Sequence, residues 1–119
     1  MARQRDRSRP SGIYAAGLQV FRFYPDGVVL DVLVKPSPGP DEGQAVAAWL
    51  HRDAPTPLNG VHVARYTLFE GVISFTTRSH FHNGVVDVRG SWSRGRLTLD
   101  LRDAGRVQSG LRFVRIWPT

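Results

Sequence analysis

Residues 21–30 read Phe-Arg-Phe-Tyr-Pro-Asp-Gly-Val-Val-Leu, and this stretch predicts a β-hairpin. Pro25-Asp26-Gly27 suits a three-residue turn, because Pro presets φ at the first corner and Gly takes the left-handed conformation that closes the hairpin. The flanking strands are expected at residues 18–24 and 28–34, which are rich in aromatic and β-branched side chains. Residues 13–17 form either a first strand or the start of the next one.

Short apolar runs continue at regular spacing through the second half of the chain. Leu97, Leu99 and Leu101 alternate with polar residues, which indicates a strand with one buried face. Each expected turn contains a glycine, as tight hairpins require. The strands expected in this half are residues 61–69, 72–79, 85–92, 97–102 and 107–117.

One short helix is expected between the two halves. Three prolines in residues 35–40 exclude a central strand or a helix interior there. Residues 42–51 predict a helix that Asp41 can cap, with Val46, Trp49 and Leu50 on one apolar face. Seven or eight antiparallel strands and one helix leave a sandwich or an up-and-down barrel. The consecutive hairpins favour the barrel, with the helix capping one end and Trp49 plugging it.

Length and composition set the class of protein. The chain has 119 residues with 41% hydrophobic and 22% charged side chains, which is typical of one globular domain. The absence of cysteine excludes disulfides, thiolate metal sites and cysteine nucleophiles. No apolar run approaches the roughly 18 residues of a membrane span, and the start lacks a secretory signal, so we expect a cytoplasmic protein. The expected organisation is a disordered Arg-rich arm, residues 1–11, and a single β-barrel domain, residues 12–119.

The arm carries much of the net charge of +6. An Arg-rich segment can neutralise the phosphates of nucleic acid, but this one has no aromatic side chain on which a base could stack. A solvated leader is therefore the favoured interpretation, and nucleic-acid binding is kept as an alternative partner hypothesis. A homodimer formed through an exposed part of the sheet is also left open. The arginines concerned are Arg3, Arg5, Arg7 and Arg9.

The two faces of the first hairpin determine which side chains point inward. One face carries Val20, Arg22, Tyr24, Val28, Leu30 and Val32, and the other carries Gln19, Phe21, Phe23, Val29, Asp31 and Leu33. The first set is more uniformly apolar, so we expect it to face the interior. Arg22 would then either anchor a ligand carboxylate or phosphate inside the barrel, or lie at the rim with its guanidinium in water.

The strands that flank Glu70-Gly71 have a clearer pattern. Pairing across this turn places the side chains of four residues on the inner face. They are Tyr66, Leu68, Ile73 and Phe75, and His62 and Thr77 share this face.

The stretch of residues 21–30 resembles the hairpin of lipocalin-like, calycin-type domains. The similarity is greatest to the C-terminal domain of one group of F-box proteins, in which a proline-containing loop, a short helix, a Gly-x-Tyr-x-Leu strand and a closing meander follow. The resemblance implies a small closed barrel that holds an apolar ligand or acts as an interaction module. No F-box is present, so no ubiquitin-ligase role carries over. The matching segments are residues 35–40, 42–51, 64–68 and 84–117.

Few residues form a pattern with catalytic or metal-binding chemistry. His80-Phe81-His82 places two imidazoles on one side of a strand, and His62 joins them only if the barrel closes suitably. Because no second cluster is present, we predict no metal and no cofactor. Nucleophile and phosphate-loop motifs are absent. Tyr66, His62, Arg22 and Thr77 form a candidate acid–base set for an alternative function, a small isomerase or cyclase acting on a hydrophobic substrate.

The function expected from the sequence is binding of a small apolar or amphipathic molecule in the barrel. An aromatic lining with one cationic anchor is the composition that such a pocket needs. The alternatives are the barrel enzyme and an interaction module that uses the arginine arm. The candidate ligand-binding residues are Arg22, Tyr24, Trp49, His62, Tyr66, Phe75 and Trp92.

Overall fold

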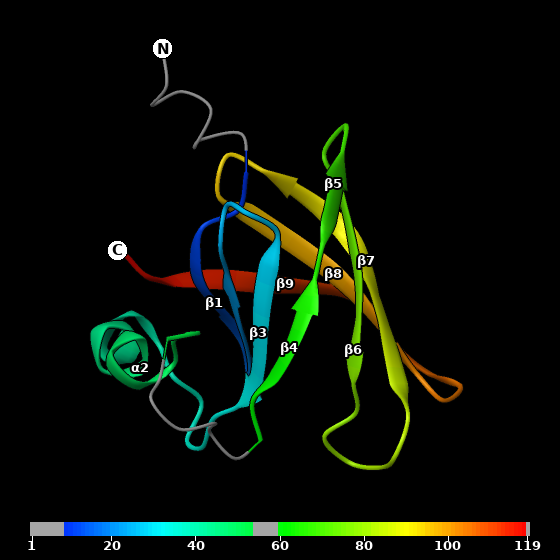
Figure 1. Cartoon of the computed structure of the whole chain (residues 1–119), viewed down its shortest axis with the longest axis horizontal. Coiled ribbons are helices and arrows are strands. Elements are labelled where there is room, and N and C mark those ends of the chain that lie inside the picture. The colour runs from blue at the N-terminus through cyan, green and yellow to red at the C-terminus, as the bar shows by residue number, and fades with distance from the viewer. Residues whose placement is uncertain (1–8, 54–59, 119) are drawn as a thin grey trace.

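The computed structural model describes residues 9–53 and 60–118, which form an antiparallel sheet with a short helix beside it (Figure 1). The turn at Pro25-Asp26-Gly27 joins two strands, as the sequence predicts. In chain order the elements are β1 (Gly12–Ala16), β2 (Gln19–Phe23), β3 (Val28–Leu33), the 3-10 helix η1 (Pro40–Glu42), α2 (Gly43–Trp49), β4 (His62–Arg65), β5 (Thr67–Phe69), β6 (Val72–Arg78), β7 (Val85–Ser93), β8 (Arg96–Asp103) and β9 (Arg106–Trp117).

The strands form one nine-stranded antiparallel sheet that curls into a nearly closed barrel. The order in the sheet is β4-β3-β2-β1-β9-β8-β7-β6-β5. Its two edge strands, β4 and β5, are consecutive in the chain and separated only at Tyr66. β4 pairs with β3 and β5 pairs with β6, so this bent segment brings the two edges of the sheet together. The barrel architecture is therefore present.

The strand count exceeds the expected seven or eight for two local reasons. Residues 12–16 form a full strand between β2 and β9. The expected strand at residues 61–69 is interrupted at Tyr66, whose backbone N–H donates to the carbonyl oxygen of Gly27. The segment of residues 62–69 is bent at Tyr66, so its first half pairs with β3 and its second half pairs with β6.

Two-residue turns join three pairs of neighbouring strands. The first residue of each turn, Glu70, Arg94 or Ala104, has a positive φ near 50°, and the glycine that follows also has a positive φ. Positive φ at both positions is the signature of a type I′ turn, whose twist matches that of the strands it joins. The turns thus fix the register of the second half of the barrel.

Aromatic side chains fill the interior of the barrel. Phe21 contacts Phe75 and Phe113 at ring-centroid distances of 5.3 and 5.4 Å, and Phe23 contacts Tyr66 at 5.7 Å. The predicted inner positions Tyr66, Ile73 and Phe75 are buried in this cluster. The Phe21–Phe75 and Phe23–Tyr66 contacts are edge-to-face, an arrangement that adds to the burial free energy of each ring. A ligand therefore has no empty lumen to enter at this level of the barrel.

The prediction for the faces of the first hairpin is wrong. Phe21, Phe23 and Val29 face the barrel interior, whereas Val20 and Leu30 lie in a second cluster with residues of α2. Both faces of this hairpin are buried, one by the barrel core and one by the helix. Apolarity alone could not distinguish the faces, because the helix-covered face carries small aliphatic side chains and the inner face carries large aromatic ones.

The helix covers the outer side of the barrel and does not plug one end (Figure 1). Val46 and Leu50 are buried against the sheet, as their spacing predicts, but Trp49 is 39% exposed. A Cβ on Gly43 would overlap the backbone carbonyl of Ile116, so glycine allows the helix to approach β9 closely. None of the helices within residues 9–53 and 60–118 is long and apolar enough to cross a membrane.

Candidate functional site

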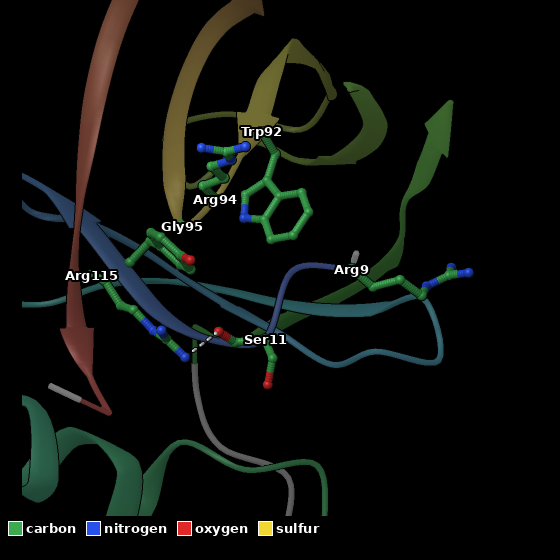
Figure 2. A pocket seen from close by; sticks show the side chains of 7 residues that line it. Arg9, Ser11, Trp92, Arg94, Gly95 and Arg115 are labelled. Atoms are coloured by element: carbon green, nitrogen blue, oxygen red, sulfur yellow. Dashed lines mark hydrogen bonds between the residues drawn. The ribbon is translucent and has the colours of Figure 1, made fainter. Parts of the chain in front are cut away.

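A pocket of about 680 Å³ lies at the end of the barrel where β7 passes into β8 (Figure 2). Residues from the beginning of β1, the turn after β7 and the end of β9 meet there, because β9 lies between β1 and β8 in the sheet. The volume is within the range of small-molecule sites. The pocket is lined by Arg9, Ser11, Tyr14, Trp92, Arg94, Gly95 and Arg115.

The indole of Trp92 carries an unused hydrogen-bond donor. Trp92 packs into the barrel core and is 8% exposed, yet its buried Nε1 has no hydrogen-bond partner among the described residues. A buried donor that lacks an acceptor costs about 1–3 kcal/mol, so such groups are rare in folded proteins. An acceptor bound in the pocket would remove this cost.

Three arginines surround this part of the pocket. In the described part of the chain, Arg9, Arg94 and Arg115 form no ion pair with a carboxylate. Arg115 Nη2 donates to the backbone oxygen of Ser11 at 3.3 Å, which holds its guanidinium beside β1. In Figure 2, Arg94 and Arg115 lie on either side of the indole nitrogen of Trp92, whereas the guanidinium of Arg9 points away from it. The pocket combines an aromatic floor with uncompensated positive charge.

The structure does not bring the predicted ligand-binding residues into one site. Trp92 lines the pocket, and Tyr66 and Phe75 lie below it in the aromatic core. His62 lies at the opposite end of the barrel, at the start of β4. The remaining candidates, Arg22, Tyr24 and Trp49, lie outside the barrel on the side that carries α2.

Arg22 fastens the helix to the barrel and does not project into the interior. Its Nη1 donates to the carbonyl oxygens of Leu50, at 2.6 Å, and Ala47, at 3.3 Å. These carbonyls lie at the C-terminal end of α2, where backbone oxygens lack helical partners and cations are favoured. The guanidinium also lies 5.0 Å from the Tyr24 ring and 4.8 Å from the Trp117 ring. Its hydrogen-bonding capacity is thus directed at the protein itself.

Tyr66 is held as a hydrogen-bond donor in the folded protein. Its hydroxyl donates to the Tyr24 carbonyl oxygen at 2.6 Å. Burial raises the pKa of Tyr66 above its ordinary value of 10.0, although the neighbouring Arg9 opposes this effect. His62, the other expected acid–base group, is four residues away along an extended strand, which corresponds to about 13 Å. The two side chains therefore do not form a common acid–base site.

The opposite end of the barrel contains a polar cluster around Asp31. The carboxylate is 1% exposed and accepts hydrogen bonds from Gln19 Nε2, at 2.6 Å, and from Thr77 Oγ1, at 2.7 Å. His80 Nε2 lies 2.8 Å from the same carboxylate, and the His62 ring stacks on His80. The sequence predicts that His62 and Thr77 share the inner face, and in the structure both side chains lie beside the Asp31 carboxylate.

The two histidines of the His80-Phe81-His82 motif have different partners. His80 contacts Asp31, whereas His82 contacts Asp103, which also accepts a hydrogen bond from Ser79. The turn after β6 separates the imidazoles that the sequence places on one side of a strand. His80 and His82 therefore do not share one site, and the ring of His80 lies against His62 instead.

Sequence reasoning missed most of the pocket. Ser11 and Tyr14 precede Arg94 and Arg115 by at least 80 residues, and the β1–β9 and β8–β9 pairings are needed to bring them to one place. The sequence contained one local signal for the pocket: Arg94 lies in the expected turn, two positions after the candidate residue Trp92. The arm residues Arg3, Arg5 and Arg7 lie outside the described residues.

Comparison with protein-family models, with curated proteins and with solved structures found no match to this chain. The nearly closed antiparallel barrel is compatible with a lipocalin-like fold. The function is therefore inferred from the geometry of the pocket and of the polar cluster at the two ends of the barrel.

Proposed function

We propose that the protein binds a small amphipathic anion in the pocket beside Trp92. The observation that carries this proposal is the buried Nε1 of Trp92 beside the guanidinium groups of Arg94 and Arg115; within residues 9–53 and 60–118, Nε1 has no acceptor and neither arginine has a carboxylate partner. We expect a carboxylate or phosphate to accept hydrogen bonds from the two guanidinium groups, because charge-assisted hydrogen bonds are the strong ones. A local movement of the side chains around Nε1 would then offer the indole N–H an acceptor as well.

The apolar part of the ligand is inferred from the remaining lining. The rings of Tyr14 and Trp92 form the inner wall, and both are buried in the barrel core. An apolar chain laid against these rings would be removed from water, which favours binding by roughly 25 cal/mol for each Å² buried. Because the interior is filled, we infer that the ligand binds at the mouth of the barrel, above the aromatic core.

A matched pair of probes tests the proposal. Decanoate carries a carboxylate on an apolar chain, and decanol carries the same chain without the charge. Isothermal titration calorimetry should detect saturable one-to-one binding of decanoate, and binding of decanol should be at least about tenfold weaker. Equal affinity for both probes would contradict the anion-binding role, and no binding of either would contradict the site.

Matched variants locate the binding. Arg94→Gln/Arg115→Gln removes two charges from the pocket and should weaken decanoate binding by about tenfold or more. Arg106→Gln/Arg112→Gln removes two exposed charges from β9 outside the pocket and should leave the affinity unchanged. Equal weakening in both double variants would show that only the net charge matters, which would contradict a built site.

A further inference from the structure

Three metal-ligating side chains meet at the end of the barrel opposite the pocket. Asp31 comes from β3, His62 begins β4, and His80 follows β6 in the chain. One carboxylate oxygen and one ring nitrogen from each histidine all lie within 4.8 Å of one another. The grouping arises from barrel closure, because β4 pairs with β3 and packs beside β6.

The charge balance of the cluster calls for a cation. Asp31 is almost fully buried, and its only ion-pair partners among the described residues are His62 and His80. A buried carboxylate is costly unless a positive charge compensates it. The two imidazoles stack with centroids 4.4 Å apart and an interplanar angle of 8°, so two positive charges on these rings would repel each other. One protonated ring or one bound metal ion could each compensate Asp31, but only a metal ion would engage both imidazoles and the carboxylate together.

The spacing of the donor atoms is close to that of a metal site. His80 Nε2 lies 2.8 Å from Asp31 Oδ1, and His62 Nδ1 lies 3.9 Å from Asp31 Oδ2. Two ligands about 2.05 Å from a tetrahedral ion are about 3.3 Å apart, so the observed distances bracket the required one. His62 Nδ1 also lies 3.0 Å from the Arg78 carbonyl oxygen, and its ring stacks almost parallel to that of His80. Because the nitrogen lone pairs of two parallel rings do not converge on one point, coordination requires the His62 ring to rotate out of the stack, to leave that carbonyl and to carry its proton on Nε2.

We propose that Asp31, His62 and His80 bind one divalent transition-metal ion such as Zn²⁺. Two imidazoles and one carboxylate are a ligand set that Zn²⁺ and its neighbours accept without thiolates. The His62 and His80 side chains are 24% and 11% exposed, so the cluster lies near the surface, where water could complete the coordination. The ion would complete a site that is separate from the pocket and independent of the anion-binding proposal.

Supporting hydrogen bonds hold the carboxylate in place. Gln19 Nε2 and Thr77 Oγ1 donate to different oxygens of Asp31, which fixes the orientation of the carboxylate toward the histidines. Outer partners of this kind typically change metal affinity by about 10–100-fold. Thr77→Val keeps the shape of the side chain and removes its hydrogen bond, so this variant should weaken metal binding within that range.

The direct test is titration of tag-free protein with Zn²⁺, by native mass spectrometry for stoichiometry and by calorimetry for affinity. The protein should bind one ion, and His62→Gln and His80→Gln should each weaken binding by more than about 100-fold. The matched control His82→Gln changes a neighbouring histidine that contacts Asp103, and it should retain full affinity. Circular dichroism of each variant distinguishes loss of the site from loss of the fold.

Two results would overturn the proposal. One is the absence of one-to-one binding in the folded wild-type protein. The other is binding that persists in folded His80→Gln or disappears in His82→Gln, because either pattern assigns the ion to other ligands. The visible absorption of bound Co²⁺ supplies a second readout, since imidazole and carboxylate ligation in a low-symmetry site should differ from the spectrum of the free ion.

Discussion

The guanidinium of Arg22 donates a 2.6 Å hydrogen bond to the carbonyl oxygen of Leu50, the residue that caps the C-terminal end of α2. This contact links β2 to the end of α2 across the outer face of the barrel. The arginine expected to bind an anionic ligand therefore binds the negative end of a helix, which presents a similar chemical group. Its role is structural.

Arg22→Met should destabilise the fold and leave anion binding intact. The substitution keeps most of the stem but leaves the Leu50 and Ala47 carbonyls without their charged donor, at a cost of about 1.5–3 kcal/mol. Urea unfolding measures the free-energy change, and calorimetry with decanoate measures the affinity. A tenfold loss of decanoate affinity in the folded variant would show that Arg22 contributes to ligand binding, contrary to a structural role.

Leu50→Ala and Trp49→Ala should differ strongly although the residues are neighbours. Leu50 is fully buried, so its truncation should lower the free energy of unfolding by about 2–5 kcal/mol. Truncation of the partly exposed Trp49 should lower it clearly less. Chemical denaturation of both variants tests this difference. Equal losses would mean that Trp49 carries as much of the helix docking as Leu50, contrary to its exposure.

The fold was largely predictable because most strands have one buried face. Leu97, Leu99 and Leu101 alternate with polar residues, and all three are buried in the barrel core. The first hairpin lacks this contrast, since the helix buries its outer face as well. For that reason the pattern around Arg22 predicted the wrong side.

The sites were much less predictable, because each depends on contacts between distant segments. The pocket needs the β1–β9 pairing to bring Arg115 near Ser11, and the polar cluster needs barrel closure to bring His62 near His80. Neither set forms a motif along the chain. The sequence singled out Trp92 for the pocket and His62, Thr77 and His80 for the polar cluster, but it did not connect the histidines with Asp31.

Ala104→Asn should stabilise the protein. Ala104 has a φ of 49° in the turn between β8 and β9, a left-handed conformation that costs an alanine about 1 kcal/mol and that asparagine tolerates better. We expect the unfolding free energy to rise by about 0.5–1 kcal/mol. A decrease in the urea midpoint would contradict the assignment of this turn.

Tyr66 should make stability fall at alkaline pH. Burial raises the pKa of Tyr66 in the folded state, so the fold favours the protonated hydroxyl. The resulting contribution to the free energy of unfolding is fully present below about pH 10 and is lost as the pH rises above that value. Tyr66→Phe lacks this titration but also lacks the hydrogen bond to the Tyr24 carbonyl. The stability difference between wild type and Tyr66→Phe should be constant from pH 6 to about 9 and should narrow above about 10. A difference that widens above pH 10 would contradict the raised pKa.

The indole N–H of Trp92 provides the most direct test of anion binding at the mouth of the barrel. The chain has three tryptophans, so a ¹⁵N-labelled sample gives three indole signals, and Trp92→Phe identifies the relevant one. On titration with decanoate, the Trp92 signal should shift saturably while those of Trp49 and Trp117 stay in place, and the shift should vanish in Arg94→Gln/Arg115→Gln. A Trp92 signal that does not move at saturating decanoate would contradict the proposed site.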